Sequence, residues 1–511
     1  MIILITLFIH YYGFIKYDYI VPPGYDSLVH ISLIKNIVNS GEINQDYPPG
    51  FHILIASLSE ITGTHPMTTV KWIAPSLLVL SIFAVFLFTR NLFGQKTAIV
   101  TAFVYGLLSK QPTLTFSDGA YPNIINADFL LIFGFLFFLK AYINERKLDI
   151  IITGLFFGVV ALFHSISFVY MLLVSFFGII ALLSYSLFKK ENLKKKILIV
   201  IKILVVSLVL GLYPAWNYYL KNILVIIKGK LLGSEAIVLT IIGYTTATIP
   251  IDSYPEYIGY LVVYLGCLGL IYLVGVFKKE RMYPHIFLFC WILTMFVASR
   301  SKSLFFFPER FARDIAIPLS ISAGIFITNY FKEIYSSIMR YIFSLLLILI
   351  FAVTIPQIIM SELQENTMVL VQQVDYDASI WLEDNVEDNT NILTSPYAHY
   401  LKVLTNKNIL TTHPNIKLVS LNDPVINQTL AFYNPSLKES KLFIHTMNIS
   451  YIYAGKKPIG WTDPWFRYNY VEKLNKVNYL EMIKIFEDET GTIYIYKVDR
   501  EKLKEELNQD L

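Results

Sequence analysis

The sequence predicts a mainly α-helical, polytopic membrane protein with a small extracytoplasmic α/β domain at its C-terminus. Of its 511 residues, 55% are hydrophobic and only 16% are charged, whereas soluble domains carry about 25% charged residues. The charges are also divided: the first 357 residues hold 27 Lys and Arg against 17 Asp and Glu, and residues 358–511 hold 15 against 21. This composition excludes an ordinary soluble enzyme, a disordered chain and a disulfide scaffold.

Apolar runs predict about eleven transmembrane helices, because a helix needs roughly 20 apolar residues to cross the bilayer. Cytoplasmic loops are the ones enriched in Lys and Arg. The alternate loops from 90–96 to 331–340 carry 15 of these residues in 43 positions, against 10 in the 121 positions of the opposite loops. We therefore expect a multi-pass protein of the cell membrane whose N-terminus is cytoplasmic. The runs lie near 1–15, 67–89, 97–109, 124–141, 150–163, 166–188, 197–216, 257–277, 286–299, 314–330 and 341–357.

Residues 1–357 are expected to form the transmembrane domain, with outer loops at 16–66, 110–123, 217–256 and 300–313. In the first of these loops, residues 28–38 repeat apolar side chains at helical spacing. This pattern predicts a short amphipathic helix along the membrane surface, with Asp26 and Ser27 in its N-cap region.

Residues 358–511 are expected to form the extracytoplasmic α/β domain. Strand-forming residues predict strands at 391–395, 442–446, 449–455 and 492–498, and helical spacing predicts a helix at 376–386. The sequons at Asn427 and Asn448 agree with a location outside the cell.

Polar residues of the first outer loop have both a functional and a structural interpretation. Asp26 and His30 would share a helix face. The carboxylate could act as a general base or help to hold a metal ion, or it could simply interact with the positive end of the helix. Asp46 and His52 flank a rigid Pro-Pro-Gly turn. His52 could contact a phosphate or a sugar, or it could be an interfacial ring without a ligand.

The later outer loops offer further candidates with the same two interpretations. Asp118 precedes a glycine, so the backbone there could approach a ligand closely, and Asp128 could be a carboxylate at a helix start. Arg310 and Arg313 depart from the positive-inside trend. They suit bidentate phosphate binding, or they could anchor the loop to lipid headgroups or neighbouring acids. For His164, at the turn between two spans, a structural role is favoured.

Three segments resemble the glycosyltransferase-C superfamily, whose members are polytopic membrane enzymes that use lipid-phosphate-linked sugars. GYDSLVHISLIKNI followed by YPPGFHIL is similar to the first outer loop of that superfamily. SDGAYPN stands where a second acidic motif is often found, and PERFARDIAIPLSISAG is similar to an Arg-containing pattern before a late span. Archaeal oligosaccharyltransferases, protein mannosyltransferases and aminoarabinose transferases belong to this superfamily.

The resemblance implies roles for individual residues. Asp26 would be the catalytic or metal-binding carboxylate, and Asp118 the second acidic residue. Arg310 or Arg313 would bind the phosphate of the donor, and a divalent cation such as Mg²⁺ or Mn²⁺ would be the cofactor, if any. The chain departs from two branches of the superfamily: it has no WWDYG motif, and Ser27 rather than a second acid follows Asp26.

The expected function is transfer of a sugar from a prenyl-phosphate-linked donor to an unidentified acceptor on the outer face of the membrane. His30 and His52, together with the two arginines, would contact the substrates; the partners are membrane lipids, and no nucleic acid is expected. Two alternatives remain at this stage. A lipid or polysaccharide transporter predicts a continuous polar path through the spans, and a non-catalytic surface scaffold predicts that Asp26, Asp118 and Arg310 lie far apart.

Overall fold

The computed structural model of the protein describes eleven stretches of the chain and a few isolated positions. Contacts between residues divide the chain into two units, the first comprising 1–18, 22–27 and 36–368, the second comprising 19–21, 28–35 and 369–511. The described stretches are residues 2–16, 20–43, 47–220, 248–276, 282–301, 308–333, 371–394, 400–411, 424–456, 470–489 and 491–509.

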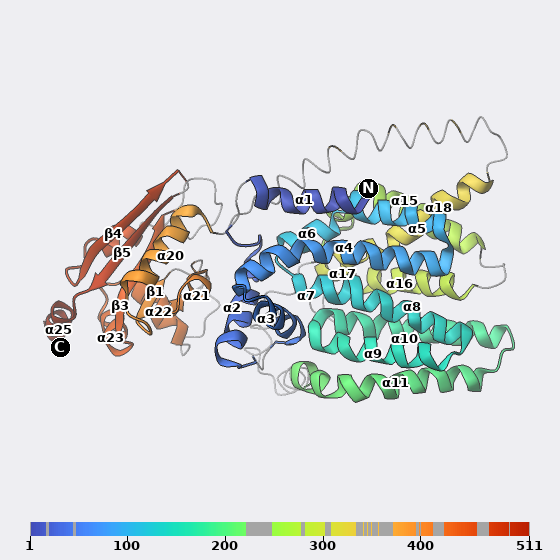
Figure 1. The fold of residues 1–511 in the computed structure, drawn as a ribbon, viewed down its shortest axis with the longest axis horizontal. Coiled ribbons are helices and arrows are strands. Elements are labelled where there is room, and N and C mark those ends of the chain that lie inside the picture. Colours follow the sequence, from blue (N-terminus) through green and yellow to red (C-terminus); the bar gives the residue numbers. More distant parts are fainter. Residues whose placement is uncertain are drawn as a thin grey trace. The chain divides into compact units, whose positions relative to one another are not determined.

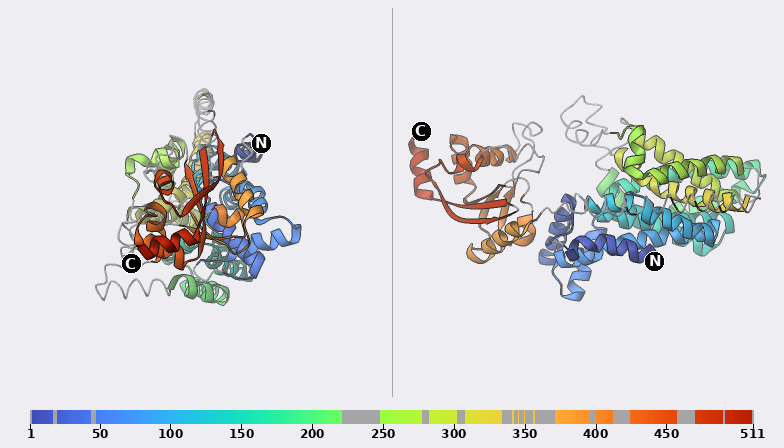
Figure 2. Two further views of the ribbon diagram at one scale, coloured as in Figure 1. Left: turned by 90° about the vertical axis from the view of Figure 1, so that its left-hand side faces the viewer. Right: turned by 90° about the horizontal axis from the view of Figure 1, so that it is seen from above.

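The first unit is a helical bundle, in which the long helices run side by side in both Figure 1 and Figure 2. Its core is a continuous cluster of buried aliphatic and aromatic side chains, as expected for helices that are apolar on more than one face. The helices are α1 (Ile2–Lys16), α2 (Tyr25–Ser40), α3 (Gly50–Thr62), α4 (Pro66–Phe93), α5 (Gln95–Phe103), α6 (Gln111–Ser117), α7 (Tyr121–Ile125), α8 (Leu131–Asn144), α9 (Lys147–Phe163), α10 (Ser165–Phe188), α11 (Leu193–Ala215), α14 (Tyr254–Ile258), α15 (Tyr260–Val276), α16 (Tyr283–Arg300), α17 (Pro308–Asp314) and α18 (Ala316–Glu333).

Six helices of the described part are long and apolar enough to cross a membrane, and a seventh span forms if the bent pair Ile251–Ile258 and Tyr260–Gly275 counts as one. Two expected spans are not among these helices, because α9 has 17 residues and α5 has nine before a π-helical turn follows, fewer than the roughly 20 that a span needs. The expected span at 341–357 lies outside the described residues except for isolated positions. The polytopic helical fold is thus present, while the number eleven stays a prediction.

Within the described stretches, three π-helical turns interrupt the bundle at η1 (Val104–Leu108), η2 (Asn126–Leu130) and η3 (Trp216–Leu220). A π-turn inserts an extra residue into a helix and rotates the side chains that follow it, and such turns are frequent at functional sites. Two of them carry polar side chains into the core, because Tyr105 lies in η1 and Asp128 lies in η2, and both side chains are fully buried.

The second unit contains a five-stranded mixed sheet in the order β2-β1-β3-β5-β4. Strands β2, β1 and β3 are parallel, and β5 and β4 continue the sheet in antiparallel fashion. The bounds are β1 (Asn391–Thr394), β2 (Asn408–Thr411), β3 (Ile449–Lys456), β4 (Leu480–Asp488) and β5 (Gly491–Val498), with helices α20 (Gln373–Asn385), α21 (Tyr400–Leu404), α22 (Pro424–Tyr433), α23 (Lys438–Thr446), α24 (Tyr470–Leu474) and α25 (Arg500–Gln509).

Helices of this unit pack on both faces of the sheet. Ile452 of β3 and Tyr496 of β5 belong to a core cluster that includes side chains of α22, α23 and α25. Tyr453 points to the opposite face, where its hydroxyl lies 2.9 Å from that of Tyr400, which donates to Asp375 of α20 at 2.8 Å. Alternation of side chains along a strand produces this three-layer arrangement.

The structure corrects one predicted strand and adds two. Residues 442–446 are helical and form the end of α23, because Ser440, Lys441 and Ile444 are buried at helical rather than alternating spacing. Strands β2 and β4 were not predicted; β4 carries several charged residues and buries none of its side chains fully. The expected domain boundary after residue 357 falls outside the described part of the chain and stays a prediction.

The predicted amphipathic helix at 28–38 is α2, and its buried apolar residues include Leu28, Ile31 and Ile34. Residues 28–35 group with the second unit, where Lys35 Nζ donates to the carbonyl oxygens of Val403 and Thr405 at 3.1 and 2.8 Å. These apolar side chains of α2 are therefore covered by protein, and the position of the helix along the membrane surface stays a prediction.

Candidate functional site

The Pro-Pro-Gly turn at residues 22–24 sets the position of Asp26 in the first unit. Gly24 precedes α2 with a φ of 92°, a conformation that favours glycine. Ser27 Oγ lies within hydrogen-bonding distance of the carbonyl oxygens of Gly24 and Pro22, at 2.5 and 2.9 Å, and Tyr121 donates its hydroxyl to Pro23 at 3.0 Å. These contacts hold the turn, so that Asp26 stands in the first turn of α2.

The end of α6 positions Asp118. Gly119 has a φ of 75°, its N–H donates to Phe116, and the next N–H, of Ala120, donates to Thr115. This is the Schellman type of helix end, in which a glycine takes the left-handed conformation. Asp118 is therefore the last residue before a fixed reversal of the chain, and its side chain is 53% exposed.

The two turns that carry the acidic residues touch each other through their glycines. A Cβ added to Gly119 would lie 2.4 Å from Ser27 N, and one added to Gly24 would lie 2.2 Å from Gly119 N. No Cβ fits at such distances. Gly119 thus allows the backbone of the first turn to approach, whereas the sequence suggested a role in the approach of a ligand, and this contact brings Asp26 and Asp118 into one site.

Helix α17 supplies one arginine to each of these acids. Arg310 Nη2 lies 3.8 Å from Asp26 Oδ2, and Arg313 Nη1 donates to Asp118 Oδ2 at 2.8 Å. Because the arginines are three residues apart, they project from one face of the helix. The four residues form a two-by-two arrangement of charges, which we call the Asp–Arg cluster.

Burial raises the pKa of the Asp26 carboxyl, and the nearby Asp118 adds to this effect, whereas Arg310 and Arg313 oppose it. Asp26 nevertheless keeps 44% of its side chain exposed. A carboxylate with a raised pKa and access to solvent is suited to accept a proton near neutral pH.

Arg313 differs from Arg310 in being almost completely buried, with 1% of its side chain exposed. Its Nη2 forms no hydrogen bond within the described part of the chain, and neither does Nε, which lies 3.5 Å from Asp314 Oδ1. A buried N–H without an acceptor costs about 1–3 kcal/mol. An anion at Nη2 would remove this cost.

A network of buried polar side chains lies next to Arg313 and includes its neighbour Asp314. Gln111 Nε2 donates to both oxygens of Asp128 at 3.2 and 3.0 Å and lies 3.4 Å from Asp314 Oδ1. Tyr105 donates its hydroxyl to Gln111 Oε1 at 2.8 Å. The four side chains are at most 2% exposed. The sequence analysis missed Gln111, although polar residues inside an apolar bundle are themselves a functional signal. Asp314 is one of the neighbouring acids that it offered as partners of the arginines.

The remaining histidines occupy different places. His52 is buried, with its ring centroid 5.3 Å from that of Tyr47, whose pKa is raised by burial and by Asp26. Burial lowers the pKa of His52 to about 4. His52 therefore packs against Tyr47, a ring that is itself close enough to Asp26 to feel its charge. His164 caps α10 by accepting from Ser167 N, as the structural interpretation predicted, and burial together with Arg310 and Arg313 lowers its pKa.

The roles predicted for two further residues stay predictions. His30 is 4% exposed and belongs to the part of α2 that groups with the second unit. Asp46 lies outside the described residues. Asp26, Asp118, Arg310 and Arg313 are the predicted residues that the structure brings into mutual contact.

The residues of the site can be compared with the ligands that the expected divalent cation needs. Among the described residues, no group of three or more His, Cys, Asp or Glu side chains could hold a metal ion. Asp26 and Asp118 supply two carboxylates, each already paired with an arginine, whereas Mg²⁺ requires six oxygen ligands in near-octahedral geometry. The described donor set does not fit a dedicated metal site.

Comparisons with known proteins identify the family and the fold of the chain. A family model described as a family of unknown function, DUF6541, matches residues 4–305. The chain belongs to this family. No curated protein matches it.

Several solved structures share the fold of the DUF6541 chain. The archaeal oligosaccharyltransferase AglB from Archaeoglobus fulgidus matches 89% of this chain and 69% of its own, with 16% identity and a TM-score of 0.65. ArnT from Cupriavidus metallidurans matches 97% of both chains, with 13% identity and a TM-score of 0.58. The arabinofuranosyltransferase AftD from Mycobacteria matches 97% of this chain and 39% of its own, with 12% identity and a TM-score of 0.59.

All three proteins have the glycosyltransferase-C fold. The resemblance predicted from the three sequence segments is thereby confirmed at the level of fold. The identities are too low to carry an activity, a substrate or a residue role from these proteins to the DUF6541 chain.

Proposed function

We propose that the protein is a membrane glycosyltransferase that moves a sugar from a lipid-phosphate-linked donor to an acceptor hydroxyl on the outer face of the membrane. The observation that carries the proposal is Arg313, a buried guanidinium with Nη2 hydrogen-bonded to nothing in the described structure, beside two acids at a membrane bundle. Such a group is the expected partner of a phosphate.

The two arginines would hold the phosphate of the donor. Arg310 is 20% exposed and Arg313 is 1% exposed, so one guanidinium meets the solvent and the other lies in the protein. In the drier environment of Arg313, its attraction for a developing negative charge is stronger than in water. Negative charge grows on the phosphate as the bond to the sugar breaks, and the arginines would stabilise it there.

Asp26 would accept the proton of the acceptor hydroxyl. The hydroxyl oxygen then forms a bond to the anomeric carbon, the bond from that carbon to the phosphate oxygen breaks, and the prenyl phosphate leaves with the electron pair. The raised pKa of Asp26 favours the proton transfer. Asp118 would orient Arg313 through their 2.8 Å hydrogen bond.

A lipid donor is supported by two structural neighbours. The AglB structure is a complex with an inhibitory peptide and a dolichol-phosphate, and the ArnT structure is bound to undecaprenyl phosphate. The proposal also includes eleven transmembrane helices and membrane lipids as partners. In the proposed orientation, residues 358–511 lie outside the cell.

We assign no step to a divalent cation. The same oligosaccharyltransferase has been crystallised in complex with Zn and sulfate, but the described residues of this chain pair both candidate carboxylates with arginines. In this arrangement the positive charge near the leaving phosphate comes from Arg310 and Arg313. Activity that survives chelation by EDTA would agree with this assignment.

The two alternative functions are less well supported. The transporter hypothesis predicts a polar path through the spans at 150–216, but the cavity between these helices is lined by apolar side chains except for two serines. The scaffold hypothesis predicts that Asp26, Asp118 and Arg310 lie far apart, but Asp26 and Arg310 form an ion pair beside Asp118.

Transfer activity can be measured in membranes that contain the full chain, with radiolabelled polyprenyl-phosphate sugars as donors. Asp26→Asn should lower transfer by about a hundredfold to ten-thousandfold, the usual contribution of a general base. The matched control is Glu42→Gln, which removes an exposed acid just beyond the same helix and should leave transfer unchanged. Equal activity of Asp26→Asn and the wild type would refute the proposal for Asp26.

A further inference from the structure

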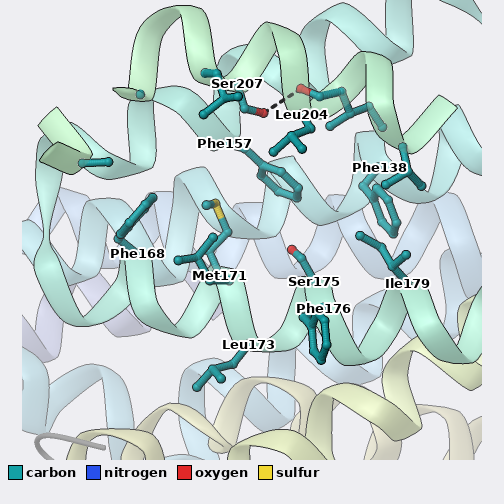
Figure 3. Close-up of a pocket in the computed structure, with 16 residues that line it drawn as sticks. Phe138, Phe157, Phe168, Met171, Leu173, Ser175, Phe176, Ile179, Leu204 and Ser207 are labelled. Atoms are coloured by element: carbon teal, nitrogen blue, oxygen red, sulfur yellow. Dashed lines mark hydrogen bonds between the residues drawn. The ribbon is translucent and has the colours of Figure 1, made fainter. Parts of the chain in front are cut away.

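The interior of the first unit is polar beside Arg313, in contrast to other parts of the bundle. The cavity of about 510 Å³ between α8, α9, α10 and α11 is lined by apolar side chains except for two serines (Figure 3). Beside Arg313, Gln111 meets Asp128 and Asp314, and each of these residues is at most 2% exposed. Burial of two carboxylates is unfavourable unless they are paired and hydrogen-bonded, so their place beside this arginine points to a role in the site.

One edge of the Arg313 guanidinium has no acceptor in the described structure. Nε and Nη2 lie side by side on this edge of the planar group, and neither forms a hydrogen bond within the described part of the chain. Nη1 is already used, because it donates to Asp118. Two parallel N–H groups form the fork that binds a carboxylate or a phosphate in bidentate fashion. We call this fork the Nε–Nη2 edge.

Asp314 lies beside the Nε–Nη2 edge without closing on it. Its Oδ1 is 3.5 Å from Nε of Arg313, whereas a good N–H···O hydrogen bond ends at about 3.2 Å. A movement of the carboxylate by about 0.5 Å would bring this oxygen to the usual distance of about 3.0 Å. A carboxylate closed on both nitrogens would satisfy the edge and would exclude a phosphate from it. Asp314 is therefore a competitor for the same two donors.

Gln111 binds the same oxygen of Asp314. Its Nε2 lies 3.4 Å from Asp314 Oδ1 and donates to both oxygens of Asp128 at 3.2 and 3.0 Å. The amide cannot be reversed, because ionised carboxylates only accept hydrogen bonds and because Oε1 accepts from the hydroxyl of Tyr105 at 2.8 Å. Gln111 is thus fixed with its NH₂ group towards the two acids, where it opposes a movement of Asp314 onto Arg313.

We propose that Gln111 is a positioning residue that holds Asp314 off the Nε–Nη2 edge of Arg313 and so keeps this edge available to the phosphate of the donor. The inference rests on the proposed function and adds to it the residue that keeps the arginine competent. Asp314 supplies the negative charge that allows Arg313 to be buried, and Gln111 prevents that acid from competing with the phosphate. Gln111 acts through its neighbours and does not itself contact the substrate.

The test combines a substitution of Gln111 with one of Asp314. Gln111→Met keeps nearly the same shape without the amide, so Asp314 should close on Arg313. Binding of undecaprenyl phosphate to the purified full chain in nanodiscs should then weaken about 10- to 100-fold, because the phosphate must displace charge-assisted hydrogen bonds. Addition of Asp314→Asn should restore most of the affinity, since a neutral amide competes less well than a carboxylate. A purely structural role of Gln111 would not be rescued by this second change.

Two further variants make the test robust. Gln111→Asn keeps the amide on a stem that is one methylene shorter, so it cannot hold both acids, and it replaces Gln111→Met if that variant does not fold. It should show the same loss and the same rescue. Asn126→Leu is the matched control, because it removes another buried amide of the bundle, which donates to the carbonyl oxygens of Val160 and His164. It should lower the melting temperature and leave the affinity unchanged.

Two results would overturn the inference. The first is wild-type affinity in the folded Gln111 variants, or a loss that Asp314→Asn does not reverse. The second concerns Asp314→Asn alone, which should bind undecaprenyl phosphate more tightly than the wild type, because a negative charge beside the phosphate is removed. Weaker binding would show that Asp314 orients the arginine and does not compete with the ligand.

An experimental structure of ligand-free Gln111→Met separates a failure of the inference from a failure of the proposed function. Asp314 oxygens within hydrogen-bonding distance of both Nε and Nη2 of Arg313 would support the role of Gln111 without any ligand. If this closure is seen while Arg313→Lys binds undecaprenyl phosphate as the wild type does, the phosphate role of the arginine fails and the positioning of Asp314 by Gln111 stands. If Arg313→Lys binds weakly but Asp314 stays open in Gln111→Met, the inference fails and the proposed function stands.

Discussion

Replacement of Arg313 by lysine should weaken prenyl phosphate binding without unfolding the protein. Lysine keeps a positive charge beside Asp118 and Asp314, so the acids retain a counterion, whereas loss of the charge would cost about 3–5 kcal/mol of stability. The guanidinium can offer Nη2 to a phosphate while Nη1 stays on Asp118, and an ammonium cannot hold both positions in the same geometry. One hydrogen bond to a charged group is worth about 1.5–3 kcal/mol, so the affinity should fall about 10- to 100-fold.

The assay is equilibrium binding of undecaprenyl phosphate to the purified protein, with thermal unfolding measured in parallel. Arg300→Lys is the matched control, because Arg300 ends α16 and donates to the carbonyl oxygen of Ile249, outside the Asp–Arg cluster. It should change the affinity by less than about twofold, since it removes no contact to the ligand. Unchanged affinity in a folded Arg313→Lys variant, or an equal loss in Arg300→Lys, would show that the buried guanidinium does not bind the phosphate.

Three other perturbations have predictable outcomes. Burial raises the pKa of Asp26, so turnover should fall as acidification protonates the carboxylate, and a pH–rate profile of Asp26→Asn should lack this acidic limb at its lower activity. Gly119→Ala should lower the melting temperature, because the left-handed conformation costs alanine about 1–2 kcal/mol and its Cβ would meet Ser27 N at 2.4 Å; a wild-type melting temperature would contradict the close contact. The pKa of His52 is lowered by burial to about 4, against about 6.5 in an unfolded chain. Protonation therefore favours unfolding, and stability should fall by up to about 3 kcal/mol between pH 6.5 and 4. His52→Phe should lose less stability over this range, and an equal loss would contradict the burial of a neutral ring.

The sequence was sufficient to select the members of the Asp–Arg cluster. Asp26, Asp118, Arg310 and Arg313 are polar residues in outer loops between apolar runs, and successive outer loops of a helical bundle end at the same side of the membrane. That argument places the residues on one face, but it does not give their pairing. The pairing depends on the glycine contact between the turns at Gly24 and Gly119.

Other features could not be predicted because they depend on contacts between distant segments. Asp128 had the properties of a carboxylate at a helix start, but a π-turn directs it into the core, where Gln111 joins it to Asp314. No local pattern indicates a π-turn. The place of His30 at the site stays a prediction, because His30 is buried in a segment that groups with the second unit.

The same limit applies to the second unit. The residues at 442–446 are of strand-forming types, but their neighbours from Lys438 onwards complete a helix with Ser440 and Ile444 on its buried side. Strand β2 has four residues and pairs in parallel with β1, so no tight hairpin turn between the two strands announces the pair. The position of such a short parallel strand depends on its pairing with the rest of the sheet, so its local sequence does not predict it.

The most direct test of the account is an experimental structure of the full chain in nanodiscs with undecaprenyl phosphate. We expect the phosphate oxygens within about 3.2 Å of guanidinium nitrogens of both Arg310 and Arg313, the range of a good N–H···O hydrogen bond. A phosphate bound elsewhere, with Arg313 still closed on Asp118 and Asp314 alone, would contradict the central claim that the Asp–Arg cluster binds the donor.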